Sequence, residues 1–191
     1  DQVAFINKLE PGTAILTEIE KDETITKEGG VRKLIWDYSI DNIGPTQRAQ
    51  RQIAACKARG IEVFLKSEPE LAFEAPGLPY IPCLDRWYER AEALAFSGAD
   101  GAWVFPWFQA CYGTTSAEVY KFAWWAPSLG KDVVMAKLAR RLAGHEAADH
   151  LRRAWTHVSK AISFSPEQPP YFCGPYYLGP AHPMFANPNA T

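Results

Sequence analysis

Strand-like and helix-like segments alternate through the first part of the chain, and this alternation restricts the possible folds more than any other feature. Apolar runs of strand character cover residues 14–20, 32–40, 61–68 and 101–107. Helix-like segments at 44–60 and 83–97 separate the last three runs. Because a helix that connects two strands usually leaves them parallel, we predict an α/β fold with a parallel sheet. The connection at 21–31 is short for a helical crossover, which leaves open whether the first two strands are parallel neighbours.

The second part of the chain has helical character. Helical periodicity extends over 116–125, 131–142 and 145–164. Gly144 separates the last two of these segments. The tail at 165–191 is rich in Pro, Gly and aromatic residues, and we expect it to wrap over an apolar surface. We therefore predict a partial (β/α) barrel of parallel strands over residues 1–126. C-terminal helices and the Pro/aromatic-rich tail would follow over residues 127–191.

The composition argues against several classes of function. The net charge of −2 at pH 7 gives no electrostatic reason to expect a nucleic acid or an anionic membrane as a partner. No run of about 18 apolar residues is present, so no membrane span is predicted. The glycine-rich phosphate-binding patterns are absent, and we predict no cofactor.

Cysteine and histidine spacing gives no metal site. The four cysteines are widely spaced, which favours reduced, buried thiols over a metal ribbon. His145 and His150 are five residues apart and would not share one face of a helix. The first residues lack the charged start and apolar core of a signal peptide. We expect a soluble protein, and the sequence leaves open whether it is cytoplasmic or exported.

An acidic residue stands on a stiff loop directly after a predicted strand. The apolar run at 61–65 is followed by the segment FEAPGLPYIP at 73–82, in which three prolines restrict the loop that carries Glu74. Barrel enzymes of the (β/α) type place their catalytic residues at the C-terminal ends of the strands. Glu74 is therefore a candidate catalytic acid.

Alternation along the strands predicts which polar side chains share a face of the sheet. Glu18, Lys66 and Glu68 have the same parity, with Asp37 added from the second run, whereas the opposite parity is mainly apolar. Glycoside hydrolysis uses a pair of carboxyl groups. The predicted catalytic residues are Glu74, Glu68 and Asp37. The predicted substrate-binding residues are Trp107, Tyr112, Trp36, Lys66 and Glu18, with the aromatic rings as stacking platforms for sugars. A solvent-facing sheet without any site would show the same alternation.

Three segments resemble a known group of proteins. FEAPGLPYIP at 73–82, GAWVFPWFQACYG at 101–113 and the late segments AWTHVSKAISFSP and GPYYLGPAHP are similar to the C-terminal part of large bacterial proteins related to glycoside hydrolases. In that group a β-hexosaminidase-like (β/α) barrel is followed by helices, an acid precedes the Pro-Tyr-Ile-Pro segment and an aromatic residue closes the next strand. Glu74 and Trp107 occupy those positions.

The resemblance covers most of residues 14–185 and departs from the group in two respects. Only four strands are visible where a full barrel has eight, and the Asp-Glu pair of β-hexosaminidases is not identifiable. The resemblance therefore implies the second half of such a barrel.

We expect a glycoside hydrolase-like, carbohydrate-active domain that acts on glycosidic bonds. One alternative is a non-catalytic carbohydrate-binding or interaction module. A third possibility is a piece whose open sheet edges pair with a missing barrel half or with another copy of the chain.

Overall fold

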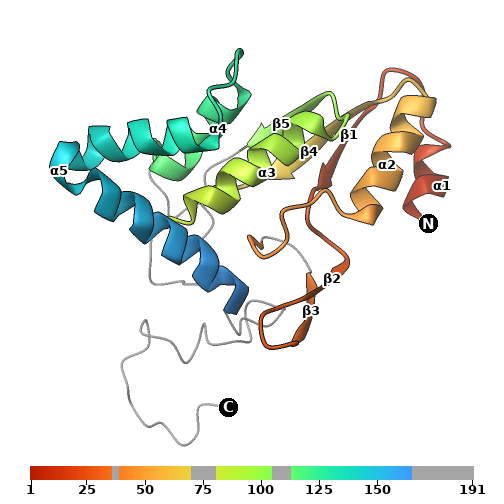
Figure 1. Ribbon diagram of the computed structural model, residues 1–191. Helices are drawn as coiled ribbons and strands as arrows, with labels where there is room; N and C mark the ends of the chain where they lie inside the picture. Colours follow the sequence, from red (N-terminus) through yellow and green to blue (C-terminus); the bar gives the residue numbers. More distant parts are fainter. Residues whose placement is uncertain (36–38, 70–80, 105–112, 165–191) are drawn as a thin grey trace, which may run out of the picture.

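The protein is a mixed α/β structure built on a three-stranded parallel sheet (Figure 1). The computed structural model describes residues 1–35, 39–69, 81–104 and 113–164. The strand order is β1 (Ala14–Glu18), β4 (Glu62–Ser67) and β5 (Gly101–Val104), with β4 in the centre. Both pairings are parallel, so the carboxyl ends of all three strands lie at the same end of the sheet.

Two helices connect and cover the sheet, at the places that the sequence predicts. Helix α2 (Gln47–Ala58) leads into β4, and α3 (Leu84–Phe96) leads into β5. The Thr46 side chain caps the first turn of α2 by accepting a hydrogen bond from the Ala49 amide at 3.3 Å. Both helices bury one apolar stripe in the core of the protein.

The two faces of the sheet differ as the predicted alternation requires. Val63 and Leu65 are fully buried and belong to the same apolar core as the buried stripes of α2 and α3. On the opposite parity, Leu16 is 46% exposed and Trp103 is 50% exposed. The sheet therefore has a covered apolar face and a second, more open face.

The predicted second strand does not join this sheet. Residues Arg32–Ile35 form β3, which pairs antiparallel with β2 (Glu23–Thr26) in a separate two-stranded hairpin. The question that the sequence left open is thus answered: the first two predicted strands are not parallel neighbours. The parallel sheet of the described residues has three strands instead of the four of the expected partial barrel, and it forms no closed barrel. The physical reason is the short connection at 21–31, which has room for a strand and a turn but not for a helical crossover.

Buried ion pairs and arginine contacts fix the segment that follows the hairpin. The Asp41 carboxylate accepts hydrogen bonds from Lys27 at 2.8 Å and from Lys33 at 2.6 Å. Arg86 of α3 donates from Nε to the Ile40 carbonyl at 2.7 Å, and Arg90 donates to the Ser39 carbonyl at 2.6 Å. The segment is thus attached both to the hairpin and to α3.

The C-terminal helices pack against α3. Helix α4 (Thr115–Trp124) is followed by α5 (Lys131–Ala161) and by a 3-10 turn, η1 (Ile162–Phe164). Gly144 interrupts α5 with φ 71° and ψ 177°, and Figure 1 shows the change of direction there. The predicted division of this region at Gly144 is therefore confirmed.

A short helix at the beginning of the chain, α1 (Gln2–Ile6), packs on α2 and was not predicted from the sequence. The core draws on the sheet and on helices α1 to α5, and its largest fully buried apolar residues are Ile6, Ile19, Ile40, Ile61, Leu65, Leu84, Trp87, Tyr88 and Tyr120. Within the described residues, no helix combines the length and the apolar character that crossing a membrane requires.

Candidate functional site

The carboxyl ends of β1 and β4 bring three of the predicted site residues together. The ammonium group of Lys66 lies 3.2 Å from a Glu68 carboxyl oxygen and 4.0 Å from a Glu18 carboxyl oxygen. Glu18 and Lys66 are partners in the strand register, which places their side chains on the same face of the sheet. The side chain of Glu18 is 26% exposed and that of Glu68 only 1%. The cluster therefore runs from a partly solvated carboxylate to a buried carboxyl group.

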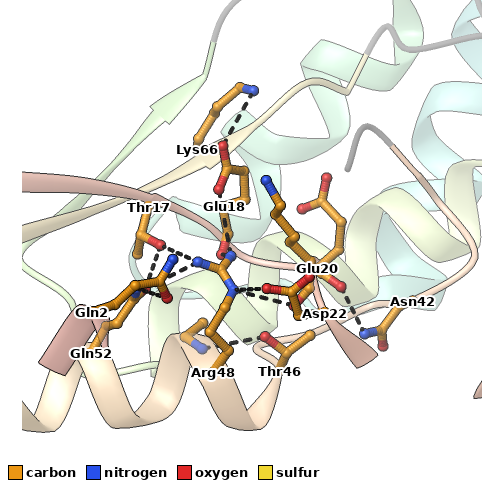
Figure 2. Close-up of polar contacts among 12 residues, drawn as sticks. Gln2, Thr17, Glu18, Glu20, Asp22, Asn42, Thr46, Arg48, Gln52 and Lys66 are labelled. Atoms are coloured by element: carbon orange, nitrogen blue, oxygen red, sulfur yellow. Dashed lines mark hydrogen bonds and ion pairs between the residues drawn. The ribbon is translucent and has the colours of Figure 1, made fainter. Parts of the chain in front are cut away.

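Arg48 of α2 contacts both the backbone and the side chain of Glu18. Figure 2 shows its guanidinium reaching from α2 to Thr17 and Glu18 on β1. It donates to the Glu18 carbonyl at 2.9 Å and to the Thr17 hydroxyl at 3.1 Å, and it lies 3.5 Å from the Glu18 carboxylate. Because the backbone and the side chain of Glu18 share one rigid donor, the direction of the carboxylate is restricted.

A glycine permits the close approach of α2 to the end of β1. Gly44 has φ 76°, and a Cβ there would lie 2.7 Å from Ile19 Cγ1 and 2.8 Å from the Ile19 carbonyl oxygen. Two residues later, the Thr46 amide donates to that same carbonyl at 2.9 Å. This junction sets the start of α2, and with it the position of Arg48, relative to β1.

Arg90 and Glu20 form a second, buried pair of charges. Arg90 of α3 places Nη1 3.8 Å from a carboxyl oxygen of Glu20, and both side chains are 1% exposed. The guanidinium of Arg90 also lies over the ring of Trp87, 5.4 Å from its centroid. Glu20 follows β1 by two residues, so this pair lies at the same end of the sheet as Glu68.

Burial changes the protonation of Glu68. Loss of solvation and, as a smaller contribution, the negative charge of Glu20 raise the pKa of its carboxyl group from 4.5 to about 8. The charges of Lys66 and Arg90 oppose this rise and do not cancel it. Although Lys66 lies at ion-pair distance, Glu68 is therefore mainly protonated at neutral pH.

Two further side chains complete the surroundings. Tyr120 of α4 shares a 2.7 Å hydrogen bond with the Ser67 hydroxyl, and burial raises the pKa of its phenol. Trp103 is the register partner of Lys66 on β5 and is half exposed. An aromatic ring thus lies on the same face of the sheet as Lys66 and Glu18.

Sequence reasoning identified part of this cluster. Glu18, Lys66 and Glu68 come together as predicted, because strand parity and parallel pairing place them at one end of the sheet. Glu74, Asp37, Trp107, Tyr112 and Trp36 lie outside the described residues. Arg48 and Arg90 were missed. Each lies on the buried stripe of a predicted helix, and an arginine on an apolar stripe is the signal that could have identified them.

A polar cavity lies elsewhere on the protein. It has a volume of about 480 Å³ and is lined by residues of the first turns of α1 and α2, among them Arg48 and Gln52. Neither Lys66 nor Glu68 lines it. In the ranges that the structure describes, no group of three or more metal-binding side chains is close enough to hold an ion.

Comparison with known proteins gives no relative for this arrangement: no protein family, no curated protein and no solved structure matches the chain. The function is therefore argued from the geometry of the cluster.

Proposed function

We propose that the protein is a carbohydrate-active domain of the glycoside hydrolase kind, in which Glu68 is the general acid and Glu18 its carboxylate partner. The observation that supports the proposal is the separation of these two groups. Lys66 Nζ lies 3.2 Å from one carboxyl oxygen and 4.0 Å from the other. The two oxygens are therefore at most about 7 Å apart, which is compatible with the roughly 5 to 9.5 Å that glycosidase carboxyl pairs span.

The two carboxyl groups have environments that suit different roles. A general acid must carry a proton at the working pH, and the raised pKa of Glu68, about 8, provides this. Glu18 lies 3.5 Å from the cation Arg48 and 4.0 Å from the cation Lys66. One acid that donates a proton to the leaving oxygen and one carboxylate that stabilises or attacks the anomeric centre are the requirements of this chemistry.

The open face of the sheet supplies a binding surface for the same substrate. Trp103, half exposed on β5, is placed to stack on an apolar face of a sugar ring, and Lys66 beside it can donate hydrogen bonds to hydroxyl groups. The resemblance to β-hexosaminidase-like barrels adds the proposal that the three parallel strands are part of a barrel-type sheet. Glu74 and Asp37 stay predicted catalytic acids, with Trp107, Tyr112 and Trp36 as predicted platforms.

A non-catalytic carbohydrate-binding module is the second candidate. The exposure of Leu16 and Trp103 on one face favours it, since such modules bind sugars on flat surfaces with aromatic rings and do not need paired acids. The two candidates differ in whether Glu68 transfers a proton to a substrate.

Turnover of glycosides with different leaving groups tests the proposal. We expect wild type to cleave aryl glycosides, hexosaminides included, and alkyl glycosides more slowly. Glu68→Gln should lower kcat/KM for alkyl glycosides by about 10² to 10⁴-fold, and much less for nitrophenyl glycosides, whose leaving group does not need a proton. Glu74→Gln is measured in parallel, and Glu118→Gln is the control, because Glu118 is a partly buried acid of α4 that is paired with the exposed Arg141.

The result also separates the candidates. Binding of oligosaccharides without turnover in any of these proteins would support the module instead of the hydrolase. The absence of both binding and turnover would reject a carbohydrate function altogether.

A further inference from the structure

We propose that the polar cavity between α1 and α2 is a second ligand site, and that it binds a small molecule with one carboxylate beside hydroxyl or ammonium donors. The cavity has a volume of about 480 Å³, which falls in the range of roughly 300 to 1,000 Å³ that is usual for small-molecule sites. Its lining residues come from the start of α1 and from α2: Asp1, Gln2, Val3, Arg48, Arg51 and Gln52. Because Lys66 and Glu68 do not line it, the proposal is independent of the proposed function.

The α2 wall of the cavity follows from spacing along the helix. Arg48, Arg51 and Gln52 stand at positions i, i+3 and i+4, so they lie on one face of α2. Arg48 and Gln52 are buried, whereas Arg51 is exposed. Two guanidinium groups therefore line the cavity from one helix face, and each stays charged at every physiological pH.

Hydrogen bonds fix the buried part of this wall. Arg48 donates to the Thr17 hydroxyl at 3.1 Å and to the Glu18 carbonyl at 2.9 Å. Its Nη1 also donates to Gln52 Oε1 at 3.3 Å, and Gln52 Nε2 donates to Gln2 Oε1 at 2.6 Å. Figure 2 shows these side chains side by side between β1 and the two helices. The wall is therefore held in place by the fold itself, and a ligand would need to order few further side chains.

Arg51 supplies the anchor for a carboxylate. In the part of the chain that the structure describes, its guanidinium makes no hydrogen bond or ion pair, so all of its N–H donors are available at the cavity. A guanidinium group matches a carboxylate with two parallel hydrogen bonds. The Gln2 side chain accepts from Gln52 through its oxygen, and its amide nitrogen can donate to a second oxygen of the ligand.

Asp1 limits the ligand to a single negative charge. Its carboxylate accepts a hydrogen bond from the Val3 amide at 3.0 Å and lines the same cavity. Asp1 is exposed, and an exposed aspartate is negatively charged at neutral pH. A second carboxylate on the ligand would be repelled there, whereas a hydroxyl or ammonium group could donate a hydrogen bond to Asp1. A hydroxy acid or an amino acid therefore fits the charges of the lining.

Amide NMR spectra of nitrogen-15-labelled protein, titrated with small probes, test the proposal directly. D-gluconate carries one carboxylate, D-glucarate carries two on the same carbon skeleton, and D-glucitol carries none. We expect gluconate to shift the amide signals of residues 2–6 and 47–52 at concentrations up to about 10 mM. Glucarate should bind several-fold more weakly and glucitol should not bind. L-glutamine is titrated in parallel, and tighter binding of glutamine or of gluconate assigns the site to an amino acid or to a hydroxy acid.

Variants of Arg51 test the anchor. Arg51→Gln should weaken binding of the tighter probe by about tenfold or more, and Arg51→Lys should lie between that variant and wild type, because it keeps the charge and loses the planar fork. Arg140→Gln is the matched control: it removes the same charge from an exposed arginine of α5 that also makes no contact of this kind with the described residues. It should bind the probe like wild type.

Several results would overturn the proposal, and some of them need only wild type. Unchanged signals of residues 2–6 and 47–52 with both gluconate and glutamine would reject a ligand site in this cavity. Shifts confined to the signals around Lys66 and Glu68 would do the same and would place the probe at the proposed sugar site. Equal binding of glucitol would reject the carboxylate, and equal or tighter binding of glucarate would reject the limit to one negative charge. Equal weakening in Arg51→Gln and Arg140→Gln would reject Arg51 as the anchor.

Discussion

At the scale of single residues, the decisive property of the cluster is that its charges are buried to different degrees. Glu18 is partly solvated and paired with Arg48, whereas Glu68 is buried and lies 3.2 Å from Lys66. Removing water from the Glu68 carboxyl group costs more than the nearby ammonium of Lys66 returns, so Glu68 keeps its proton at neutral pH.

This protonation should appear in the stability of the protein. The pKa of Glu68 is about 8 in the folded state and 4.5 when unperturbed, so between these values the folded chain binds one proton more than the unfolded chain. Stability from this group is complete below about pH 4.5 and is lost as the pH rises through 8. Relative to Glu68→Gln, wild type should lose about 1 kcal/mol of unfolding free energy per pH unit in this window.

Urea denaturation of both proteins at intervals from pH 5 to pH 8 measures this difference. Glu118→Gln is the control, because its ion pair with Arg141 lowers the pKa of Glu118 and the group stays ionised throughout the window. The difference between that variant and wild type should be constant. A constant difference for Glu68→Gln as well would mean that Glu68 is ionised in the folded protein.

At the scale of elements, α5 depends on a residue without a side chain. Gly144 has φ 71° and ψ 177°, a conformation that is almost restricted to glycine, and a Cβ at this position would meet no atom within 4 Å. Gly144→Ala should therefore destabilise the protein by about 1 to 3 kcal/mol through backbone strain alone. Thermal and urea denaturation measure the loss.

Glu146→Ala, an exposed substitution two residues further along α5, is the matched control and should change the stability by less than about 0.5 kcal/mol. An unchanged or increased stability of Gly144→Ala would show that α5 is continuous and that no bend at Gly144 is needed.

Elements also show what the sequence can predict here. Helices α2 and α3 follow from apolar periodicity, from Thr46 as a cap and from glycines after their ends, all of which are local signals. The pairing of β3 could not be predicted in this way, because Arg32–Ile35 has the same strand character whether it joins a parallel sheet or a hairpin. Its partner β2, with the alternating sequence Glu23–Thr26, was overlooked within a segment that reads as a polar connection.

The same distinction applies to the site. Strand parity brings Glu18 and Lys66 to one face, since the period of two is a property of the strand itself. Arg90 reaches Glu20 only because α3 packs against the sheet, and no spacing in the sequence encodes that distance. Long-range contacts between elements are therefore the part that sequence reasoning could not supply.

At the scale of the whole molecule, the sheet and the hairpin should differ in local stability. Strand β4 is paired on both sides, and its Val63 and Leu65 side chains are fully buried in the core. Strands β2 and β3 pair only with each other among the described strands, and an isolated hairpin is marginally stable. Its attachment to the rest of the protein includes the buried contacts of Asp41 with Lys27 and Lys33.

Hydrogen exchange followed by mass spectrometry should therefore show two levels of protection. We expect the amides of β4 to exchange at least about tenfold more slowly than those of β2 and β3, because opening β4 requires disruption of the core. Asp41→Asn should accelerate exchange in the hairpin, since it leaves two buried ammonium groups with weaker partners, and should change β4 much less. Equal acceleration of exchange in both regions would mean that the hairpin and the parallel sheet unfold as one cooperative unit. The contacts that Arg86 and Arg90 of α3 make with the segment after the hairpin would then couple the hairpin to the core more strongly than the separation of the two sheets suggests.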